Sequence, residues 1–256
     1  MKHIDTVLIT GASSGIGYEF AKLYAKNEHN LILVARNEER LAEIREELSN
    51  VEVNIIAMDL ARPAAPKELF EEVKKRQLRV NVLINNAGYG MTGNFANLEI
   101  EKQLQMIQLN VTSLTYLTHL FLQDMQEDRY GRILNVGSVA SFVSTPSMSV
   151  YAATKAFVLS FSESLGSELK HQGDFVVTAL CPGPTKTNFA KVANVGKLEK
   201  IFDQYGIEVS RVAAAGYNGL EKRKSVVVPG KRFSTLVRIS QLLPRRQLQH
   251  LLSRNL

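Results

Sequence analysis

The sequence predicts one doubly wound α/β domain built on a seven-stranded parallel sheet. Short apolar, β-branched runs alternate along the chain with longer amphipathic segments, which is the pattern of a parallel sheet covered by helices. A glycine-rich turn directly follows the first apolar run and precedes a helical pattern. At 256 residues with 45% hydrophobic composition, the chain is long enough to bury one large core.

Seven strands and six helices are expected in alternation. We place the strands at residues 6–10, 31–35, 51–58, 80–85, 132–136, 175–180 and 226–229. We place the helices at residues 16–26, 38–48, 66–76, 99–126 with a break near Asn110, 151–170 and 210–222. Asn37 and Ser210 are expected N-caps, because their side-chain oxygens can accept hydrogen bonds from the free amides of a first helical turn. Right-handed crossovers then collect the carboxyl ends of the strands along one edge.

Composition and charge exclude several classes of protein. Nine of the 31 Lys and Arg lie from Lys222 onward, where there is no Asp or Glu, so the net charge of +6 belongs to the tail and no nucleic-acid partner is expected. Five scattered histidines and one cysteine predict no metal site. We expect a cytoplasmic protein for three reasons. Cys181 is the single cysteine, the sequence starts without a secretory pattern, and it has no apolar run of about 18 residues.

The glycine-rich turn at residues 10–17 indicates a dinucleotide site. Without Cβ atoms, the backbone can turn sharply after a strand and approach a diphosphate at the positive N-terminus of the next helix. Such turns also occur for structural reasons alone, but the position between a strand and a helix favours a nucleotide. The candidate cofactor contacts in this turn are Gly11, Ser13, Ser14, Gly15, Ile16 and Gly17.

The residue after the second strand indicates which dinucleotide binds. A site that prefers NAD usually has a carboxylate here, whereas this chain has Arg36. A guanidinium can pair with a 2′-phosphate through charge-assisted hydrogen bonds, and Ser13 or Ser14 can add a hydroxyl donor. We therefore predict NADP(H) as the cofactor in preference to NAD(H). The alternative is that Arg36 is only a solvated residue at a strand end.

Two further strand ends offer cofactor contacts. Asp59 is expected to accept from the adenine amino group while Leu60 packs on the ring, although a helix cap explains Asp59 equally well. After the fourth strand, small residues would let the backbone approach the cofactor and Asn side chains would brace neighbouring turns, or the segment is only a structural turn. The candidates in this segment are Asn86, Ala87 and Gly88.

Residues suited to carbonyl chemistry follow later in the chain. Tyr151 and Lys155 are four residues apart at the start of a helix, so both project from one face, and Ser138 lies just beyond the fifth strand. Carbonyl reduction by hydride needs an acid for the forming alkoxide. The Lys155 ammonium, with the positive ring of NADP⁺, is expected to lower the pKa of Tyr151 for this task. Ser138 is expected to hold the carbonyl oxygen, and Asn110 to hold a water that links Lys155 to solvent.

Taken together, these motifs resemble the short-chain dehydrogenase/reductase family, and in particular bacterial members of broad specificity related to ketoacyl reductases and hydroxysteroid dehydrogenases. The matching segments are TGASSGIG at 10–17, NNAG at 85–88, Asn110, Ser138, YAATK at 151–155 and PGPTKT at 182–187. The resemblance implies a Rossmann-type fold, a homodimer or homotetramer, and a nicotinamide ribose bound by Lys155. It implies a catalytic tetrad of Asn110, Ser138, Tyr151 and Lys155. It also implies that the nicotinamide is flanked by Pro182, Gly183, Thr185 and Thr187.

The expected activity is reversible reduction of a ketone or aldehyde to an alcohol, with Tyr151 as general acid/base. The alternative is a sensor or scaffold that binds NADP(H) without significant turnover, and the complete tetrad weighs against it. A lipophilic carbonyl/alcohol substrate is expected because the cleft residues are mostly apolar, although core packing explains them nearly as well. The expected lining is Tyr89, Gly90, Phe142, Val143, Pro146, Met148 and residues 189–209, which form either a helical lid or a plain surface excursion.

A basic amphipathic C-terminal extension at residues 231–256 is expected to follow a dinucleotide-binding catalytic domain at residues 1–230. Apolar residues recur in the extension at helical spacing, with Pro244 separating two segments. Packing against its own domain or a partner subunit is the expected role. Contact with an anionic membrane surface is the alternative.

Overall fold

The computed structural model describes residues 4–193, 196 and 204–243, and it confirms the predicted seven-stranded parallel sheet. The strand order is β3-β2-β1-β4-β5-β6-β7, and every neighbouring pair is parallel. The strands are β1 Thr6–Thr10, β2 Asn30–Ala35, β3 Val53–Ala57, β4 Val82–Asn85, β5 Tyr130–Val136, β6 Asp174–Leu180 and β7 Val226–Val227.

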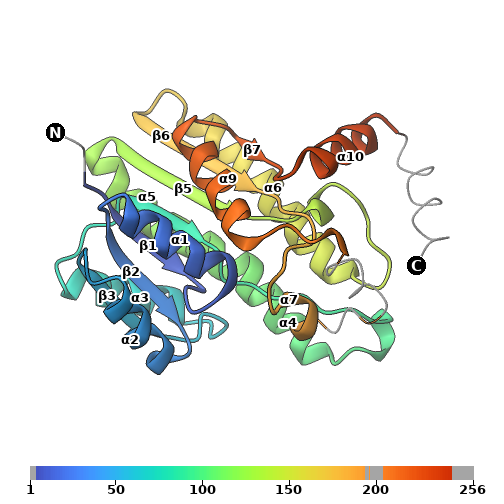
Figure 1. Cartoon of the computed structure of the whole chain (residues 1–256), viewed down its shortest axis with the longest axis horizontal. Helices are drawn as coiled ribbons and strands as arrows, with labels where there is room; N and C mark the ends of the chain where they lie inside the picture. The colour runs from blue at the N-terminus through green and yellow to red at the C-terminus, as the bar shows by residue number, and fades with distance from the viewer. Residues whose placement is uncertain (1–3, 194–195, 197–203, 244–256) are drawn as a thin grey trace.

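Helices connect the strands and cover both faces of the sheet (Figure 1). In the described part of the chain they are α1 Gly15–Lys26, α2 Glu38–Glu47, α3 Ala65–Lys75, α4 Ile100–Ile107, α5 Leu114–Asp128, α6 Ser149–Leu169, α7 Phe189–Val192, α9 Val209–Glu221 and α10 Lys231–Leu242. Short 3₁₀ turns lie at Phe95–Asn97 (η1) and Val139–Ser141 (η3). A π-helical turn (η2, Gln108–Ser113) interrupts the long helical segment at the break predicted near Asn110.

Two apolar clusters, one on each face of the sheet, form the core. One cluster joins the sheet to α1, α2 and α9 and contains the fully buried Phe20. The other joins the sheet to α3, α5 and the end of α6 and contains Phe121. Val7 enters the first cluster and Leu8 the second, because successive side chains of a strand point to opposite faces. A strand buried on both faces needs the continuous apolar runs seen in the sequence.

Several element boundaries differ from the prediction by one or two residues, and local hydrogen bonding accounts for the clearest cases. β4 begins at Val82 rather than at residue 80, because the Asn81 side chain, not a ladder carbonyl, accepts the Thr6 N–H at 3.0 Å. β7 ends at Val227, two residues early and ahead of Pro229, which has no N–H to donate.

Of the two predicted N-caps, one is confirmed and one is wrong. Asn37 Oδ1 accepts the Arg40 N–H at 2.9 Å at the start of α2. Ser210 does not cap α9, because the helix already begins at Val209. The Glu208 carbonyl accepts from the N–H groups of Arg211 and Val212, so the first turn forms one residue before the predicted start.

The functional edge of the sheet lies at the carboxyl ends of β1 and β4. These strands are neighbours although β2 and β3 separate them in the chain, so the connections leave this pair toward opposite sides. Open α/β sheets bind ligands in the crevice at such a switch point. The glycine-rich turn follows β1 and the segment 85–88 closes β4 at the same edge. In the described ranges, no helix is long and apolar enough to cross a membrane.

Candidate active site

The glycine-rich turn has the backbone geometry that a diphosphate cradle requires. Gly11 and Gly15 have φ angles of 66° and 56°, in the left-handed region that favours glycine. A Cβ on Gly17 would lie 2.3 Å from the Gly11 carbonyl oxygen, so no side chain fits there. Ser14 directly precedes α1, and its side chain makes no capping hydrogen bond with the helix. The free amides of the first turn of α1 therefore face a space shaped by backbone alone, which fits a bound diphosphate.

Asn86 and Thr10 hold this turn in place. Asn86 Nδ2 donates to the carbonyl oxygens of Thr10 at 2.9 Å and Gly11 at 3.2 Å, which is the bracing expected of this segment. Thr10 Oγ1 accepts the N–H groups of Asn86 and Ala87, both at 3.0 Å. The sequence analysis did not single out Thr10, because its partners are 76 and 77 residues away in the chain.

The loop after β6 lies opposite the glycine-rich turn. A Cβ on Gly15 would come within 3.3 Å of Thr187 Cγ2, so the two predicted cofactor segments face each other closely. Thr185 Oγ1 donates to the Gly183 carbonyl at 2.9 Å, and Thr187 Oγ1 accepts the Phe189 N–H at 3.1 Å. Pro182 is buried beside them. The hydrogen bonds of Thr185 and Thr187 therefore fix the shape of the loop after β6, next to the glycine-rich turn.

Arg36 lies just beyond the end of β2 with its side chain exposed. Burial raises the pKa of Tyr89, Asp59 raises it further and Arg36 opposes the shift, so all three side chains belong to the same edge of the sheet. No ion pair within the described part of the chain engages the Arg36 guanidinium, which leaves it available to an anion. Asp59 Oδ1 accepts the Ala61 N–H at 3.0 Å within the turn that follows β3. Asp59 is not a helix cap, the alternative for this residue, because α3 begins only at Ala65 with Ala64 at its N-cap. Leu60 is 5% exposed and packs into the core cluster around α3 and α5.

The predicted catalytic residues meet beyond the carboxyl ends of β4 and β5. The Ser138 side chain lies next to the Tyr151 hydroxyl, and its hydrogen bonding lowers the pKa of Tyr151. Lys155 Nζ donates to the Val136 carbonyl at 2.8 Å and lies 5.9 Å from the centroid of the Tyr151 ring. α6 begins at Ser149, so Tyr151 and Lys155 lie one turn apart near its start. The fold therefore gathers three side chains that are separated by up to 17 residues.

Burial dominates the electrostatics of this group. It raises the pKa of Tyr151 to about 12, against the hydrogen bond with Ser138, which lowers it. Burial also lowers the pKa of Lys155 to about 8. The expectation that the Lys155 ammonium lowers the pKa of Tyr151 is therefore wrong for the protein by itself, because loss of hydration outweighs the nearby charge. At pH 7 the phenol is protonated, which is the form that a proton donor needs.

Asn110 lies in the π-helical turn, where its side chain ties two segments together. Its Nδ2 donates to the Tyr89 carbonyl at 3.0 Å and to Thr154 Oγ1 at 3.1 Å, while its Oδ1 accepts the Tyr89 N–H at 3.2 Å. A Cβ on Gly88 would lie 2.9 Å from Asn110 Oδ1 and 3.5 Å from Lys155 Nζ. The side chains of Asn110 and Lys155 therefore meet beside Gly88, which is the arrangement that a proton relay between them requires.

Ser141 is a site residue that the sequence analysis missed. Its hydroxyl accepts the Ser138 N–H at 3.2 Å and donates to the Lys155 carbonyl at 2.7 Å. One side chain thus joins the loop that carries Ser138 to the helix that carries Tyr151 and Lys155. The signal available in the sequence was a serine three residues after another at a helix start, the spacing of a capping box.

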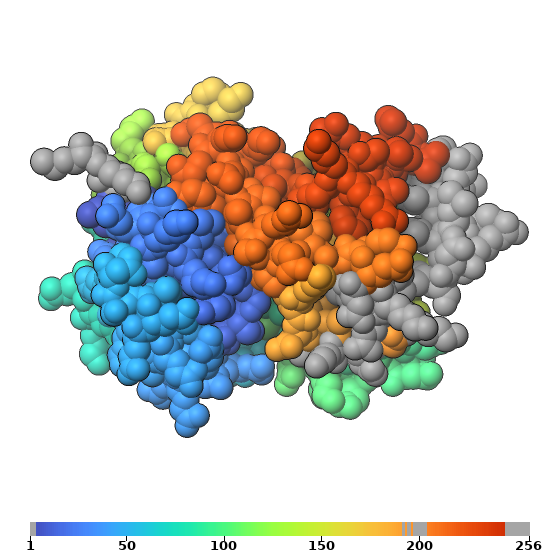
Figure 2. Space-filling view, in the orientation of Figure 1, coloured from blue at the N-terminus to red at the C-terminus, as the bar shows by residue number. Residues whose placement is uncertain are grey.

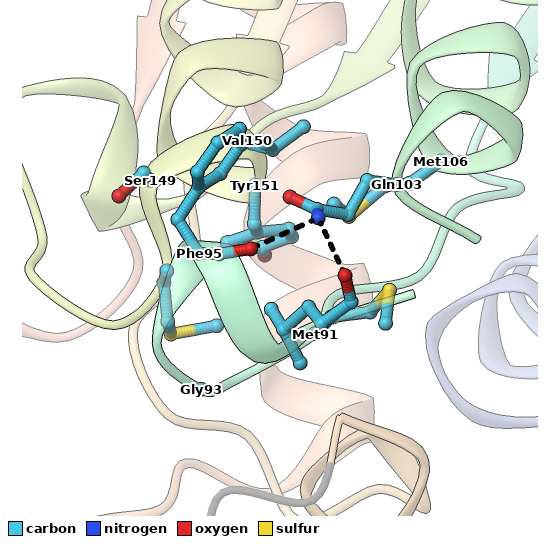
Figure 3. A pocket seen from close by; sticks show the side chains of 10 residues that line it. Met91, Gly93, Phe95, Gln103, Met106, Ser149, Val150 and Tyr151 are labelled. Carbon is cyan, nitrogen blue, oxygen red and sulfur yellow. Dashed lines mark hydrogen bonds between the residues drawn. The ribbon is translucent and has the colours of Figure 1, made fainter. Parts of the chain in front are cut away.

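On the substrate side of Tyr151, the surroundings are apolar. Tyr151 packs in one cluster with Met106 and Met148, against which Tyr89 and Met91 are packed. A small cavity of about 10 Å³ between α4 and the start of α6 is lined by Tyr151 and by Met91, Phe95, Gln103, Met106 and Met148 among others (Figure 3). Gln103 Nε2 closes one side of it by donating to the carbonyls of Phe95 and Leu98 at 3.4 and 3.2 Å. Phe142, predicted to line the cleft, packs instead against Leu159 and Cys181.

Phe189 covers the ring of Tyr151. Their centroids are 5.4 Å apart, and a Cβ on Gly90 would lie 2.7 Å from Phe189 Cζ. Phe189 is the first residue of α7 and of the predicted 189–209 segment. Residues 194–195 and 197–203 of that segment lie outside the described ones. A substrate that approaches Tyr151 from this side must displace the phenyl ring.

Similarity to known proteins agrees with this geometry. The chain matches the model of the short chain dehydrogenase family over residues 5–197 and belongs to that family. Over 75% of its length it is 37% identical to sulfoacetaldehyde reductase 2 of Chromohalobacter salexigens, of which it covers 77%.

Solved structures give the same result. A short-chain dehydrogenase from Sphingobium yanoikuyae in complex with NADPH is similar with a TM-score of 0.83 and 35% identity, covering 93% of this chain and 94% of that one. The bulky-bulky ketone specific alcohol dehydrogenase from Comamonas testosteroni has a TM-score of 0.77 and 30% identity, covering 94% and 93%. The chain is therefore an oxidoreductase of a family that uses NAD or NADP.

Proposed function

We propose that this protein is an NADP(H)-dependent reductase that converts a ketone or aldehyde to an alcohol, reversibly, with Tyr151 as the general acid/base. The observation that carries the proposal is the meeting of three buried side chains: Ser138 lies next to the Tyr151 hydroxyl, and Lys155 Nζ lies 5.9 Å from the centroid of the Tyr151 ring. A neutral phenol next to a second hydroxyl donor is suited to polarise and then protonate a carbonyl oxygen.

In the proposed reaction, the bound cofactor supplies the hydride to the carbonyl carbon. Ser138 and Tyr151 hold the carbonyl oxygen by donating hydrogen bonds, which fixes the carbon in reach of the hydride. As negative charge develops on that oxygen, Tyr151 transfers its proton to it. Lys155, still cationic below its pKa of about 8, stabilises the phenolate that remains. Proton return to Tyr151 runs from solvent through Lys155 and the region of Asn110.

The residues proposed to hold the cofactor lie along the edge already described. The glycine-rich turn and the start of α1 would hold the diphosphate, Lys155 the nicotinamide ribose, and the loop of Thr185 and Thr187 the nicotinamide. Asp59, and the backbone at Leu60, would lie beside the adenine. Asn86, Ala87 and Gly88 would form the floor next to the riboses.

NADP(H) is proposed over NAD(H) because of Arg36. Its exposed guanidinium directly follows β2, where a 2′-phosphate of the adenosine ribose would lie, and the described chain offers it no carboxylate partner. The test is kcat/KM with NADPH and with NADH for the wild type and for Arg36→Leu. We expect the wild type to favour NADPH and the substitution to lower kcat/KM for NADPH about 10- to 100-fold, the value of one or two charge-assisted hydrogen bonds. Equal use of NADH by the wild type would contradict the assignment.

The proposed substrate is a lipophilic carbonyl compound, because methionine and aromatic side chains pack around Tyr151. The experiment is NADPH oxidation over a panel of aldehydes, diketones, ketoacyl thioesters and steroids, with NADPH binding measured in parallel by fluorescence. Turnover of one or more carbonyl classes supports the proposal. Tight NADPH binding without oxidation across the whole panel would replace it with a sensor or scaffold. We further propose that the protein is cytoplasmic and forms a homodimer or homotetramer. Sedimentation velocity measures the oligomeric state.

A further inference from the structure

The tail helix α10 is fixed to the domain by one face. Phe233 packs its ring on Gly183, where an added Cβ would lie 2.8 Å from the ring, and Val237 is buried one turn later. Gly230, with a φ of 83°, turns the chain just before the helix begins. The expected role of the extension at residues 231–256 is packing against its own domain or a partner subunit. In α10 the Phe233 and Val237 side packs on the domain, and residues 244–256 of the extension lie outside the described ones.

The opposite face of α10 remains apolar and exposed. Leu236, Ile239 and Leu242 are 52%, 50% and 84% exposed, and their spacing of three residues places them along one side of the helix. α10 forms a projection at the edge of the molecule, separated from α9 by a hollow (Figure 2). Exposed leucine and isoleucine in a row are unusual on a free surface and indicate a contact surface.

The charges that α10 itself carries are all positive. Lys231, Arg232 and Arg238 lie on the same helix, and the sequence from Lys222 to the end has no Asp or Glu. A second exposed apolar row exists on α4, where Ile100 and Leu104 are 49% and 57% exposed. That row has Glu99 and Glu101 beside it, and Lys102, which pairs with Glu99 at 2.9 Å. Both rows are exposed and apolar, but only the row on α10 is flanked by basic residues alone.

We propose that α10 docks on an anionic membrane surface, with Leu236, Ile239 and Leu242 entering the interface between lipid headgroups and acyl chains. Charge complementarity selects this occupant, because basic residues flanking an apolar helix face are attracted to anionic lipids. A second copy of the same helix would bring like charges together. The proposal concerns only where the protein binds and does not depend on the reaction that it catalyses.

The test is co-sedimentation of the full chain with vesicles of phosphatidylcholine alone and of phosphatidylcholine with phosphatidylglycerol. The wild type is expected to bind the anionic vesicles and not the neutral ones. The triple substitution L236S/I239S/L242S is expected to lower the partition coefficient at least tenfold. The pair K231Q/R238Q is expected to lower it about 30-fold at low salt, about fivefold for each charge.

The matched control is I100S/L104S on α4, which removes exposed apolar area without touching α10 and is expected to leave vesicle binding unchanged. NADPH fluorescence and circular dichroism of each variant establish that it is folded. The proposal is overturned if the wild type does not bind anionic vesicles, or if the α10 and α4 variants lose binding equally. It is also overturned if the α10 triple substitution changes the oligomeric state in sedimentation velocity while vesicle binding stays the same, since the row then contacts another copy.

Discussion

The two sides of Tyr151 are built by different means. On the cofactor side, glycine backbone and side-chain-to-backbone hydrogen bonds determine the shape, as at Gly17 and in the bonds of Asn86 to Thr10 and Gly11. On the substrate side, Met106, Met148 and other apolar groups make contacts that many residues could replace. A fixed ligand needs a fixed backbone, whereas a cleft for varied carbonyl compounds needs only apolar volume.

This difference has a consequence for tolerance to substitution. On the cofactor side, added atoms meet backbone that cannot move without breaking the turn. On the substrate side, Met adapts its three side-chain torsions to the space available. We therefore expect substitutions on the cofactor side to lower activity or NADPH affinity by orders of magnitude. Volume-conserving substitutions on the substrate side should change kcat and stability only a little.

The largest effect is expected at Lys155, where the two sides meet. Lys155→Met should lower kcat/KM by about a thousandfold or more, because the phenolate loses its cation and the ribose its donor. The same variant should gain stability without added cofactor. The folded protein loses the Lys155 proton at about pH 8 and the unfolded chain at about 10.5, so the buried ammonium costs roughly 3 kcal/mol at and below pH 8.

The free-energy cost of burying the Lys155 ammonium is expected to disappear as the pH rises from 8 to 10.5, because Lys155 then also loses its proton in the unfolded chain. Urea unfolding of wild type and Lys155→Met at pH 7, 8, 9 and 10 measures the difference. The variant should be more stable at pH 7, and the gap should narrow steadily above pH 8. Equal stability at pH 7 would mean that the ammonium is well hydrated in the folded protein.

Gly17→Ala is the next largest change and tests the cofactor side alone. The new Cβ would lie 2.3 Å from the Gly11 carbonyl oxygen, so the turn must shift. We expect NADPH binding to weaken about 100-fold, measured by fluorescence titration, with thermal unfolding at a lower temperature. Gly166→Ala on α6 is the matched control, because its new Cβ would come no closer than 3.5 Å to its nearest neighbour, Val177 Cβ. Near-normal NADPH affinity in Gly17→Ala would show that the turn is not the cradle.

Met148→Leu is expected to have the smallest effect. The substitution conserves volume and polarity in the cluster around Tyr151, so stability should change by less than about 1.5 kcal/mol. We expect kcat to stay within about threefold and KM values to shift unequally between substrates of different shape. If Met148→Leu reduced function about 100-fold, as expected for Gly17→Ala, the cofactor side and the substrate side of Tyr151 would not differ in their tolerance to substitution.

Sequence patterns predicted the backbone geometry of the glycine-rich turn because its residues have little freedom. Gly11 and Gly15 need positive φ angles, and Tyr151 with Lys155 needs the spacing of a helix turn, so each leaves a mark in the sequence. Thr10 and Ser141 left no such mark, and Phe189 was predicted only as part of the 189–209 lining. Their partners lie elsewhere in the chain, and an ordinary threonine, serine or phenylalanine becomes specific only when the fold brings those partners near.

Electrostatics was the other part that residue types did not predict. A lysine four residues after a tyrosine indicates a lowered tyrosine pKa, but the burial of both groups reverses that expectation. Burial depends on how α6 packs against the sheet, which no local pattern reports. The same is true of Ser210, whose capping role was lost because the Glu208 carbonyl starts the helix earlier.

The most direct test of the central claim is hydride transfer by Tyr151→Phe, measured under single-turnover conditions with NADPH and a carbonyl substrate of the wild type. The phenyl ring keeps the buried contacts with Phe189 and removes only the proton donor. We expect NADPH affinity within about threefold of the wild type and a rate of NADPH oxidation lower by about 10²- to 10⁴-fold, the usual contribution of a general acid. A rate close to that of the wild type would contradict the assignment of Tyr151 and the mechanism that rests on it.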